Sequence, residues 1–139
     1  VAGLTYLKSL DFVQFDRIGT VGFCAGGGNA WNLAVNLEEL AAMVAFYGTP
    51  LPSAEEIARI KSPVLGIYAE LDRNLTLQTP GAITQLINQR KTFGFHIYQG
   101  ANHAFHNDTS PSYDAAASCD AWSRTLAWFN KFLRTPAAA

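Results

Sequence analysis

The sequence predicts an α/β fold built from about four mostly parallel strands flanked by helices. Short β-rich runs alternate with helical patterns along the whole chain, which is typical of strand–helix–strand units. These runs are almost continuously apolar, as expected for parallel strands with both faces covered. With 139 residues, the chain is long enough for one domain with a substantial core. We predict a single domain over residues 1–134 and a C-terminal tail over residues 135–139.

Apolar runs and helical spacings define the elements in chain order. The N-terminal segment places Leu4, Leu7 and Leu10 on one helical face, with Lys8 opposite. Ser53 is suited to cap a short acidic helical turn. The predicted strands are Arg17–Phe23, Ala41–Tyr47, Val64–Ala69 and Phe93–Tyr98, and the longer predicted helices are Val1–Leu10, Gly27–Leu37, Gly81–Gln89 and Ser112–Leu133.

The last predicted helix carries large aromatic side chains at near-helical spacing, which most often indicates a core-facing stripe. They are Trp122, Trp128, Phe129 and Phe132. Cys119 lies among small residues of the same helix, and we expect it to pack there rather than to act as a resolving thiol.

Composition and charge exclude several classes of function. A net charge of −1 gives no electrostatic case for binding nucleic acid or a membrane surface. No apolar stretch approaches the ~20 residues of a membrane span. The two cysteines lie in dissimilar contexts and do not suggest a disulfide framework, so we expect a reducing, cytoplasmic location.

The most informative segment is Gly22-Phe23-Cys24-Ala25-Gly26-Gly27-Gly28. It follows an apolar run and precedes a helical stretch, which is the strand–turn–helix order of a nucleophile elbow with cysteine in place of serine. We expect Cys24 to have a strained backbone, and Gly22 and Gly26 to leave room where strand and helix cross. A position at a helix N-terminus also favours a thiolate. The alternative is that Cys24 is a small buried hydrophobe.

Two later loops carry candidate partners for the cysteine. Asp72 follows the predicted strand 64–69, and His103 follows the predicted strand 93–98. Because the carboxyl ends of parallel strands meet at one edge of a sheet, both loops should open beside Cys24. We predict that His103 acts as the general base, that Asp72 orients it, and that the backbone N–H of Ala25 stabilises an oxyanion.

Other residues compete for these roles. Asp72 can instead form an Asx turn within its own loop. His106 can line the pocket or face solvent, while His96 lies within a strand and is expected to be packed or half-exposed. Glu70 competes with Asp72, but its place at the strand end favours packing or a position at the loop mouth.

These segments together resemble the dienelactone hydrolase family of α/β-hydrolases. The matching segments are Gly22–Gly27, Phe46–Gly48, Pro63–Asp72, Tyr98–Phe105 and Ala121–Leu126. The resemblance covers essentially the whole of this chain but only the C-terminal portion of a family member. It therefore implies that the chain forms a shortened domain with a partial α/β-hydrolase fold. It also implies a triad of Cys24, Asp72 and His103 that opens lactones or small esters through an acyl-enzyme, with no metal or organic cofactor.

Two departures from the family pattern bear on substrate and assembly. Family members hold a substrate carboxylate with arginines, and one of those arginines falls at the position of Asn107 here, which argues against a dienelactone substrate. The strands that precede the nucleophile strand in the family are absent, together with the loop that supplies a second oxyanion donor. Residues Arg17–Phe23 should therefore form an open apolar edge, through which two chains can meet as a symmetric homodimer.

The expected function is hydrolysis of a small-molecule ester or lactone. Phe23, Tyr47 and Phe105 are candidate walls of the substrate pocket, although core packing explains these side chains equally well. The alternative is a catalytically impaired family fragment that serves as an assembly or binding module. A third hypothesis, a redox-responsive thiol at Cys24, has no nearby resolving cysteine to support it.

Overall fold

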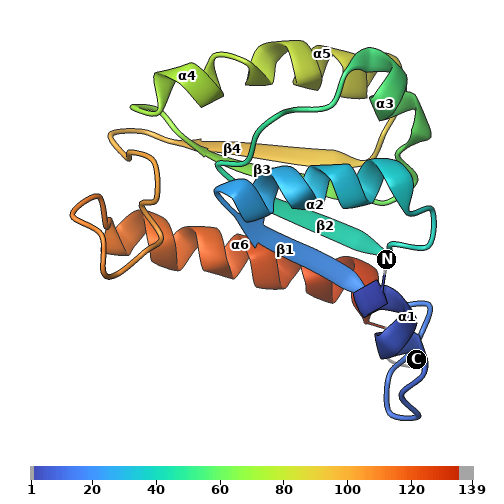
Figure 1. The fold of residues 1–139 in the computed structure, drawn as a ribbon. Coiled ribbons are helices and arrows are strands. Elements are labelled where there is room, and N and C mark those ends of the chain that lie inside the picture. Colours follow the sequence, from blue (N-terminus) through green and yellow to red (C-terminus); the bar gives the residue numbers. More distant parts are fainter. Residues whose placement is uncertain (1, 135–139) are drawn as a thin grey trace.

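A four-stranded parallel sheet forms the centre of the molecule (Figure 1). The computed structural model describes residues 2–134, so the predicted tail and Val1 lie outside the described residues. The strands are β1 Gly19–Phe23, β2 Ala42–Phe46, β3 Val64–Ala69 and β4 Phe93–Tyr98, and they lie side by side in the order β1-β2-β3-β4. The predicted α/β fold is confirmed, and the predicted bounds of β3 and β4 match those observed.

Helices cover both faces of this sheet, as predicted (Figure 1). They are α1 Ala2–Lys8, α2 Ala25–Asn36, α3 Ala54–Arg59, α4 Arg73–Thr76, α5 Thr79–Asn88 and α6 Ala115–Leu133. The crossover helices α2, α3 and α5 lie on one face, because each successive strand adds on the same side through a crossover of the same hand. The closing helix α6 covers the other face. Within residues 2–134, no helix has both the length and the apolar character needed to cross a lipid bilayer.

Local hydrogen bonds set where the helices begin. Ser53 forms a capping box with Glu56 at the start of α3, as the sequence predicts. The carboxylate of Asp114 accepts a hydrogen bond from the N–H of Ala117, so α6 begins after this cap rather than at Ser112. The short helix α4 is not foreseen from the sequence, and the N-terminal helix ends at Lys8 with none of its residues buried.

Side chains of the central strands alternate between two cores. Met43 and Ala45 of β2 pack with Trp31 of α2 on the crossover face. Val44 and Phe46 point the other way, into the core that α6 covers. Every residue of β2 and β3 is buried, which explains why these strands read as continuous apolar runs.

The closing helix buries a stripe of small side chains rather than its large aromatic ones. Ala117, Ala121 and Thr125 face the sheet, and they let α6 approach it closely. The core prediction for Trp122 is wrong, because this side chain lies beside the buried stripe and is 41% exposed. Cys119 is also exposed, which contradicts its predicted packing role. The remaining aromatic residues of the stripe, Trp128, Phe129 and Phe132, are partly buried.

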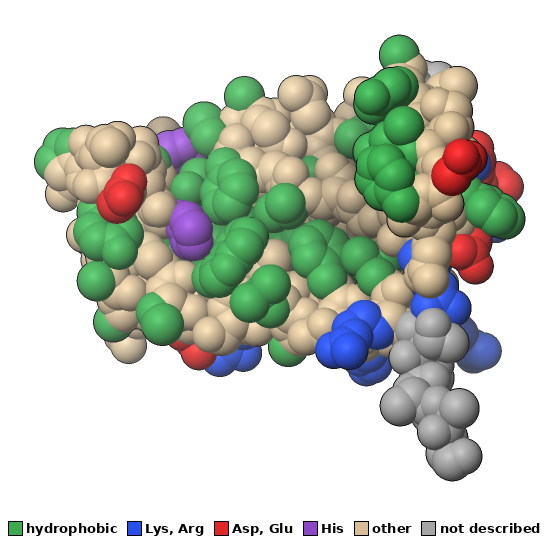
Figure 2. Space-filling model, turned by 90° about the horizontal axis from the view of Figure 1, so that it is seen from below, with side chains coloured by type: hydrophobic (Ala, Val, Ile, Leu, Met, Phe, Trp, Pro, Cys, Tyr) green, Lys and Arg blue, Asp and Glu red, His purple; other side chains and the backbone are tan. Residues whose placement is uncertain are grey.

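One edge of the sheet is open, as predicted. β1 is an edge strand, and α6 comes close to it at Gly19, where an added Cβ would lie 3.0 Å from side-chain atoms of Phe129. Farther along the strand, Val21 is 36% exposed and Phe23 is 37% exposed. Figure 2 shows apolar side chains gathered on this face of the molecule beside histidine side chains. This open flank adjoins the loops in which the candidate site lies.

Candidate active site

Cys24 lies at the tip of a sharp turn between β1 and α2. Its backbone has φ 54° and ψ −119°, a conformation that non-glycine residues rarely adopt, so the predicted strain is present. The N–H of Cys24 donates to the carbonyl of Phe46 at 3.0 Å, while its own carbonyl accepts from Gly27 and Gly28. Because these bonds begin at the turn itself, α2 starts at Ala25 instead of at Gly27.

Glycine is required at some positions of the turn and not at others. An added Cβ on Gly22 would lie 1.9 Å from the carbonyl oxygen of Gly26, which confirms that Gly22 lets strand and helix cross. The same reasoning is wrong for Gly26, whose added Cβ would meet open space. Gly28 and Gly27 are also tight: an added Cβ would lie 2.0 Å from the carbonyl oxygen of Thr49 at Gly28 and 2.7 Å from that of Phe46 at Gly27.

The loop after β3 positions Asp72 through its backbone. The N–H of Asp72 donates to the carbonyl of Ala69, and its own carbonyl accepts from the N–H groups of Leu75 and Thr76, the last two residues of α4. The hydroxyl of Thr76 also donates to the carbonyl of Ala69 at 2.6 Å. The Asp72 side chain makes no capping bond, so the alternative of a local turn or cap is wrong and the carboxylate is free to reach another loop.

The loop after β4 is joined directly to the loop of Asp72. The Glu70 carboxylate accepts from the N–H of Gly100 at 2.8 Å, and the N–H of Leu71 donates to the carbonyl of Ala101 at 2.9 Å. Glu70 therefore lies at the loop mouth, as expected, and its hydrogen bond to Gly100 holds the segment that leads to His103. The short helix α4 and this hydrogen bond are positioning features that the sequence pattern alone did not reveal.

The three candidate side chains form one hydrogen-bonded chain. The imidazole Nε2 of His103 lies 3.2 Å from the Sγ of Cys24, and its Nδ1 lies 2.5 Å from the Oδ2 of Asp72. The Asp72 side chain is mostly buried, with 13% exposed, whereas that of His103 is 35% exposed. A carboxylate at Nδ1 favours the tautomer with its proton there, which leaves Nε2 as an acceptor toward the thiol.

A backbone donor and a neutral hydroxyl lie beside this chain. Ala25 is the first residue of α2, so its N–H has no partner within the helix and is suited to bind an oxyanion. The ring of Tyr47 lies 4.9 Å from that of His103. Burial raises the pKa of Tyr47 to about 12; a backbone hydrogen bond at His106 opposes this shift, and the nearby side chain of Cys24 adds to it. Tyr47 therefore remains a neutral hydroxyl across the physiological pH range.

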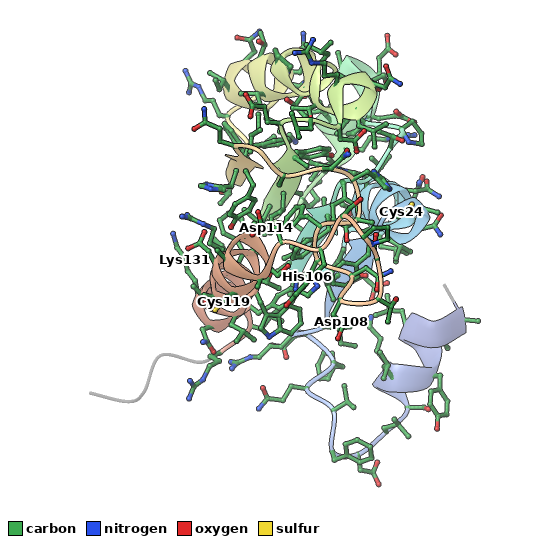
Figure 3. The ribbon with its side chains drawn as sticks, turned by 90° about the vertical axis from the view of Figure 1, so that its left-hand side faces the viewer. Cys24, His106, Asp108, Asp114, Cys119 and Lys131 are labelled. Carbon is green, nitrogen blue, oxygen red and sulfur yellow. The ribbon has the colours of Figure 1, made fainter. Side chains whose placement is uncertain are left out.

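A cavity of about 320 Å³ opens at the sulfur of Cys24. Phe23 and Tyr47 line it as expected, and His106 and Asn107 complete much of its wall. Phe105, the third expected wall residue, is instead fully buried in the core under α6, with its ring 5.5 Å from that of Tyr47. His106 was an open alternative, and here it lines the pocket (Figure 3).

The remaining candidates lie away from the sulfur. His96 is half-buried within β4, as expected, and burial lowers its pKa. Cys119 lies on α6 and is not paired with Cys24, since both thiols are free. Among residues 2–134, no three or more His, Cys, Asp or Glu side chains are grouped so that they could hold a metal ion.

Comparisons with known proteins show which family the chain resembles. The model of the dienelactone hydrolase family matches residues 1–133. A candidate carboxymethylenebutenolidase of Saccharolobus solfataricus is 38% identical over 128 residues, covering 90% of this chain and 49% of that protein. The crystal structure of a candidate dienelactone hydrolase of Klebsiella pneumoniae superposes with a TM-score of 0.86 at 26% identity, covering 94% of this chain and 58% of that one.

A third match is named for a different activity. A dienelactone hydrolase-like promiscuous phosphotriesterase from metagenomic libraries superposes with a TM-score of 0.83 at 25% identity, covering 96% of this chain and 59% of that one. The chain spans about half the length of the curated relatives it matches. The family match extends over almost the entire chain, including the cysteine elbow and both partner loops. The chain therefore belongs to the dienelactone hydrolase family.

Proposed function

We propose that the chain provides the catalytic centre of a cysteine-dependent hydrolase of small esters or lactones. The observation that carries this proposal is the continuous contact from the thiol of Cys24 through His103 to Asp72. A nucleophile, a base in hydrogen-bond reach and a third group that orients the base are the three parts that covalent catalysis needs. Membership of a family named for dienelactone hydrolysis supports the same reaction class.

The proposed reaction begins with formation of an acyl-enzyme. His103 Nε2 takes the thiol proton, and the sulfur of Cys24 attacks the carbonyl carbon of the ester. The negative charge that develops on the carbonyl oxygen is stabilised by the N–H of Ala25. When the tetrahedral intermediate collapses, the carbon–oxygen bond to the leaving group breaks and His103 returns the proton to the departing alkoxide. A lactone opens in the same way, with its alcohol still attached to the acyl group.

The same groups then hydrolyse the thioester, with water in the place of the thiol as the nucleophile. His103 removes a proton from water, which attacks the thioester carbonyl, and the sulfur leaves and is reprotonated. Asp72 stabilises the imidazolium that forms in each half of the reaction. Every proton taken up by His103 is returned, so the cycle yields one acid and one alcohol without another reactant.

Hydrolysis of 4-nitrophenyl acetate tests the proposal. Cys24→Ala and His103→Gln should each lower kcat by at least about 1,000-fold, because either change removes a member of a unit that acts together. His96→Gln is the matched control: it changes a histidine of β4 outside the cavity and should keep the wild-type rate. Mass spectrometry of quenched reactions should find the acetyl group on the Cys24 peptide and not on the Cys119 peptide.

Equal background rates for the wild type and the Cys24→Ala variant would contradict the proposed activity. The family fragment would then act as an assembly or binding module. Acetylation found on a residue other than Cys24 would show that Cys24 is not the nucleophile. The proposed esterase activity would still hold.

We also propose that a second copy of this chain covers the open flank of β1 in a cytoplasmic homodimer. The exposed side chain of Val21 supports this, since an apolar edge strand is prone to pair. The two free thiols are compatible with a reducing compartment. Sedimentation velocity at micromolar concentration should find a dimer, and a monodisperse monomer would contradict this assembly.

A further inference from the structure

A second cavity continues from the one that holds the sulfur of Cys24. It has a volume of about 530 Å³ and extends from the elbow toward α6. Phe23 and His106 line both cavities, so the two spaces meet at these side chains. In Figure 3, His106 lies between Cys24 on one side and Cys119 of α6 on the other. The cavity at the nucleophile and the cavity beside α6 are therefore neighbours that share the side chains of Phe23 and His106.

Aromatic rings form the walls where the two cavities join. The ring of His106 lies 5.3 Å from that of Phe23 and 5.8 Å from that of Trp122. Phe46 packs edge-on against His106 from the core at 5.1 Å, which fixes the imidazole from its buried side. The outer rings remain partly exposed, with Phe23 at 37% and Trp122 at 41%. Such rings provide contact area for a planar apolar group.

The charge of these walls selects against an anion. Among the described residues that line the two cavities there is no lysine or arginine, and Asp108 supplies a carboxylate. A carboxylate on the substrate would meet this negative charge without a cation to pair with. An uncharged aromatic group would contact the rings and lose no ionic hydration.

We infer that the second cavity is a binding subsite for an uncharged aromatic group of the ester whose carbonyl lies at Cys24. This inference rests on the hydrolase function proposed above and adds the substrate class: neutral aryl-bearing esters, not esters that carry a carboxylate. It also gives a role to Trp122, whose exposure on α6 contrasts with the burial of its neighbour Ala121.

Two series of esters test the subsite. The first keeps 4-nitrophenol as the leaving group and varies the acyl group among butanoyl, 3-phenylpropanoyl and succinyl. The second keeps the acetyl group and compares 2-phenylethyl acetate with butyl acetate. In at least one series the aryl ester should have a kcat/KM about tenfold above its alkyl counterpart, the scale of one well-filled apolar pocket. The succinyl ester should be the poorest acyl substrate.

Variants separate ring contact from charge. Trp122→Ala should remove the aryl preference, whereas Leu126→Ala, which shortens an exposed side chain one turn later on α6 and outside both cavities, should leave it intact. Asp108→Lys should raise kcat/KM for the succinyl ester relative to the butanoyl ester. An aryl preference in neither series, or one that survives Trp122→Ala, would overturn the subsite.

Binding without turnover distinguishes this inference from the proposed activity. NMR titration with 3-phenylpropan-1-ol should shift the indole N–H resonance of Trp122, whereas 3-phenylpropanoate should shift it about tenfold less at equal concentration. If no ester is hydrolysed but the alcohol binds at Trp122, the subsite stands and the hydrolase function fails. If esters are hydrolysed without aryl preference, the hydrolase function stands and the subsite fails.

Discussion

The two edge strands of the sheet, β1 and β4, carry complementary parts of the site but differ in how they are covered. β4 leads to the loop of His103, and β1 leads directly to Cys24. Phe95 of β4 stacks on Tyr68 at 5.6 Å, and Tyr98 donates to the carboxylate of Asp120 on α6 at 2.6 Å. On β1, Val21 is 36% exposed and Phe23 is 37% exposed, although the ring of Phe23 lies 4.5 Å from that of the buried Phe46. β4 is also exposed, at Ile97, so the two edges differ in which neighbours cover them and not in exposure alone.

This difference indicates that the proposed triad and the proposed substrate walls have different structural origins. The triad depends on β2 and β3, which are buried on both faces and hold the loops of both edge strands in register. The walls depend on what packs outside β1 and on the surface of α6. The hydrogen-bonded chain can therefore be complete within this chain while the surface beside it stays open to ligand or partner.

The largest expected effect comes from removing the charged hydrogen bond between Asp72, in the loop after β3, and His103, in the loop after β4. Asp72→Asn should lower kcat by about 1,000- to 10,000-fold, because the amide no longer stabilises the imidazolium and can hold the wrong tautomer. Asp16→Asn removes an exposed carboxylate from the loop before β1 and should keep the wild-type rate. Steady-state hydrolysis of 4-nitrophenyl acetate measures both variants, and a loss below tenfold in Asp72→Asn would reject its role.

A pair of glycine variants tests how tightly β1 and α2 cross at the elbow. Gly22→Ala should lower the free energy of unfolding by about 3 kcal/mol, since its Cβ would meet backbone atoms that cannot move aside. Gly26→Ala should change stability by less than about 1 kcal/mol, and in the stabilising direction, because alanine favours a helix and the space is open. Urea denaturation of both variants checks the contrast, and equal losses would show that the crossing is looser than described.

Charging the open edge sharpens the contrast between the two edge strands. Val21→Glu places a carboxylate on the exposed flank of β1, so the proposed dimer should dissociate with a Kd at least about tenfold higher. Ile87→Glu makes the same change on the exposed surface of α5 and should leave the Kd unaltered. Sedimentation equilibrium measures both dissociation constants. An unchanged Kd in Val21→Glu would show that the dimer does not form through the flank of β1.

The chemistry-bearing parts of the fold were predictable because they are encoded locally. The close crossing at Gly22, the cap at Ser53 and the apolar strands each depend on a few neighbouring residues, and the structure contains all three, although Gly26 does not have the predicted close contact. What was not predictable depends on contacts across the chain. Cys119 was expected inside because its neighbours are small, and Trp122 because of its spacing. The small stripe of Ala117 to Thr125 instead decides which side of α6 faces the sheet.

The same limit applies to the pocket walls. Phe105 and His106 are adjacent in the sequence and were both plausible pocket residues. Phe105 packs against Tyr47 and Tyr98, which buries its ring, whereas the ring of His106 lines the cavity. Only the three-dimensional path of the loop after β4 decides which of the two side chains is buried and which lines the pocket.

The smallest expected effect belongs to the covered edge, at His96 of β4. Burial, and next the positive charge of Arg124, lower the pKa of His96, whereas the carboxylate of Asp120 opposes the shift. The folded state therefore binds fewer protons at this site than the unfolded chain, so its contribution to stability is complete above the ordinary pKa of about 6.5 and is lost as the pH falls below it. Because His96 is half-exposed, His96→Gln should reduce the difference in unfolding free energy between pH 7.5 and pH 5 by less than about 1 kcal/mol. Urea denaturation at the two pH values measures this difference, and a steeper pH dependence in the variant would mean that the half-covered edge of β4 holds His96 in its charged form.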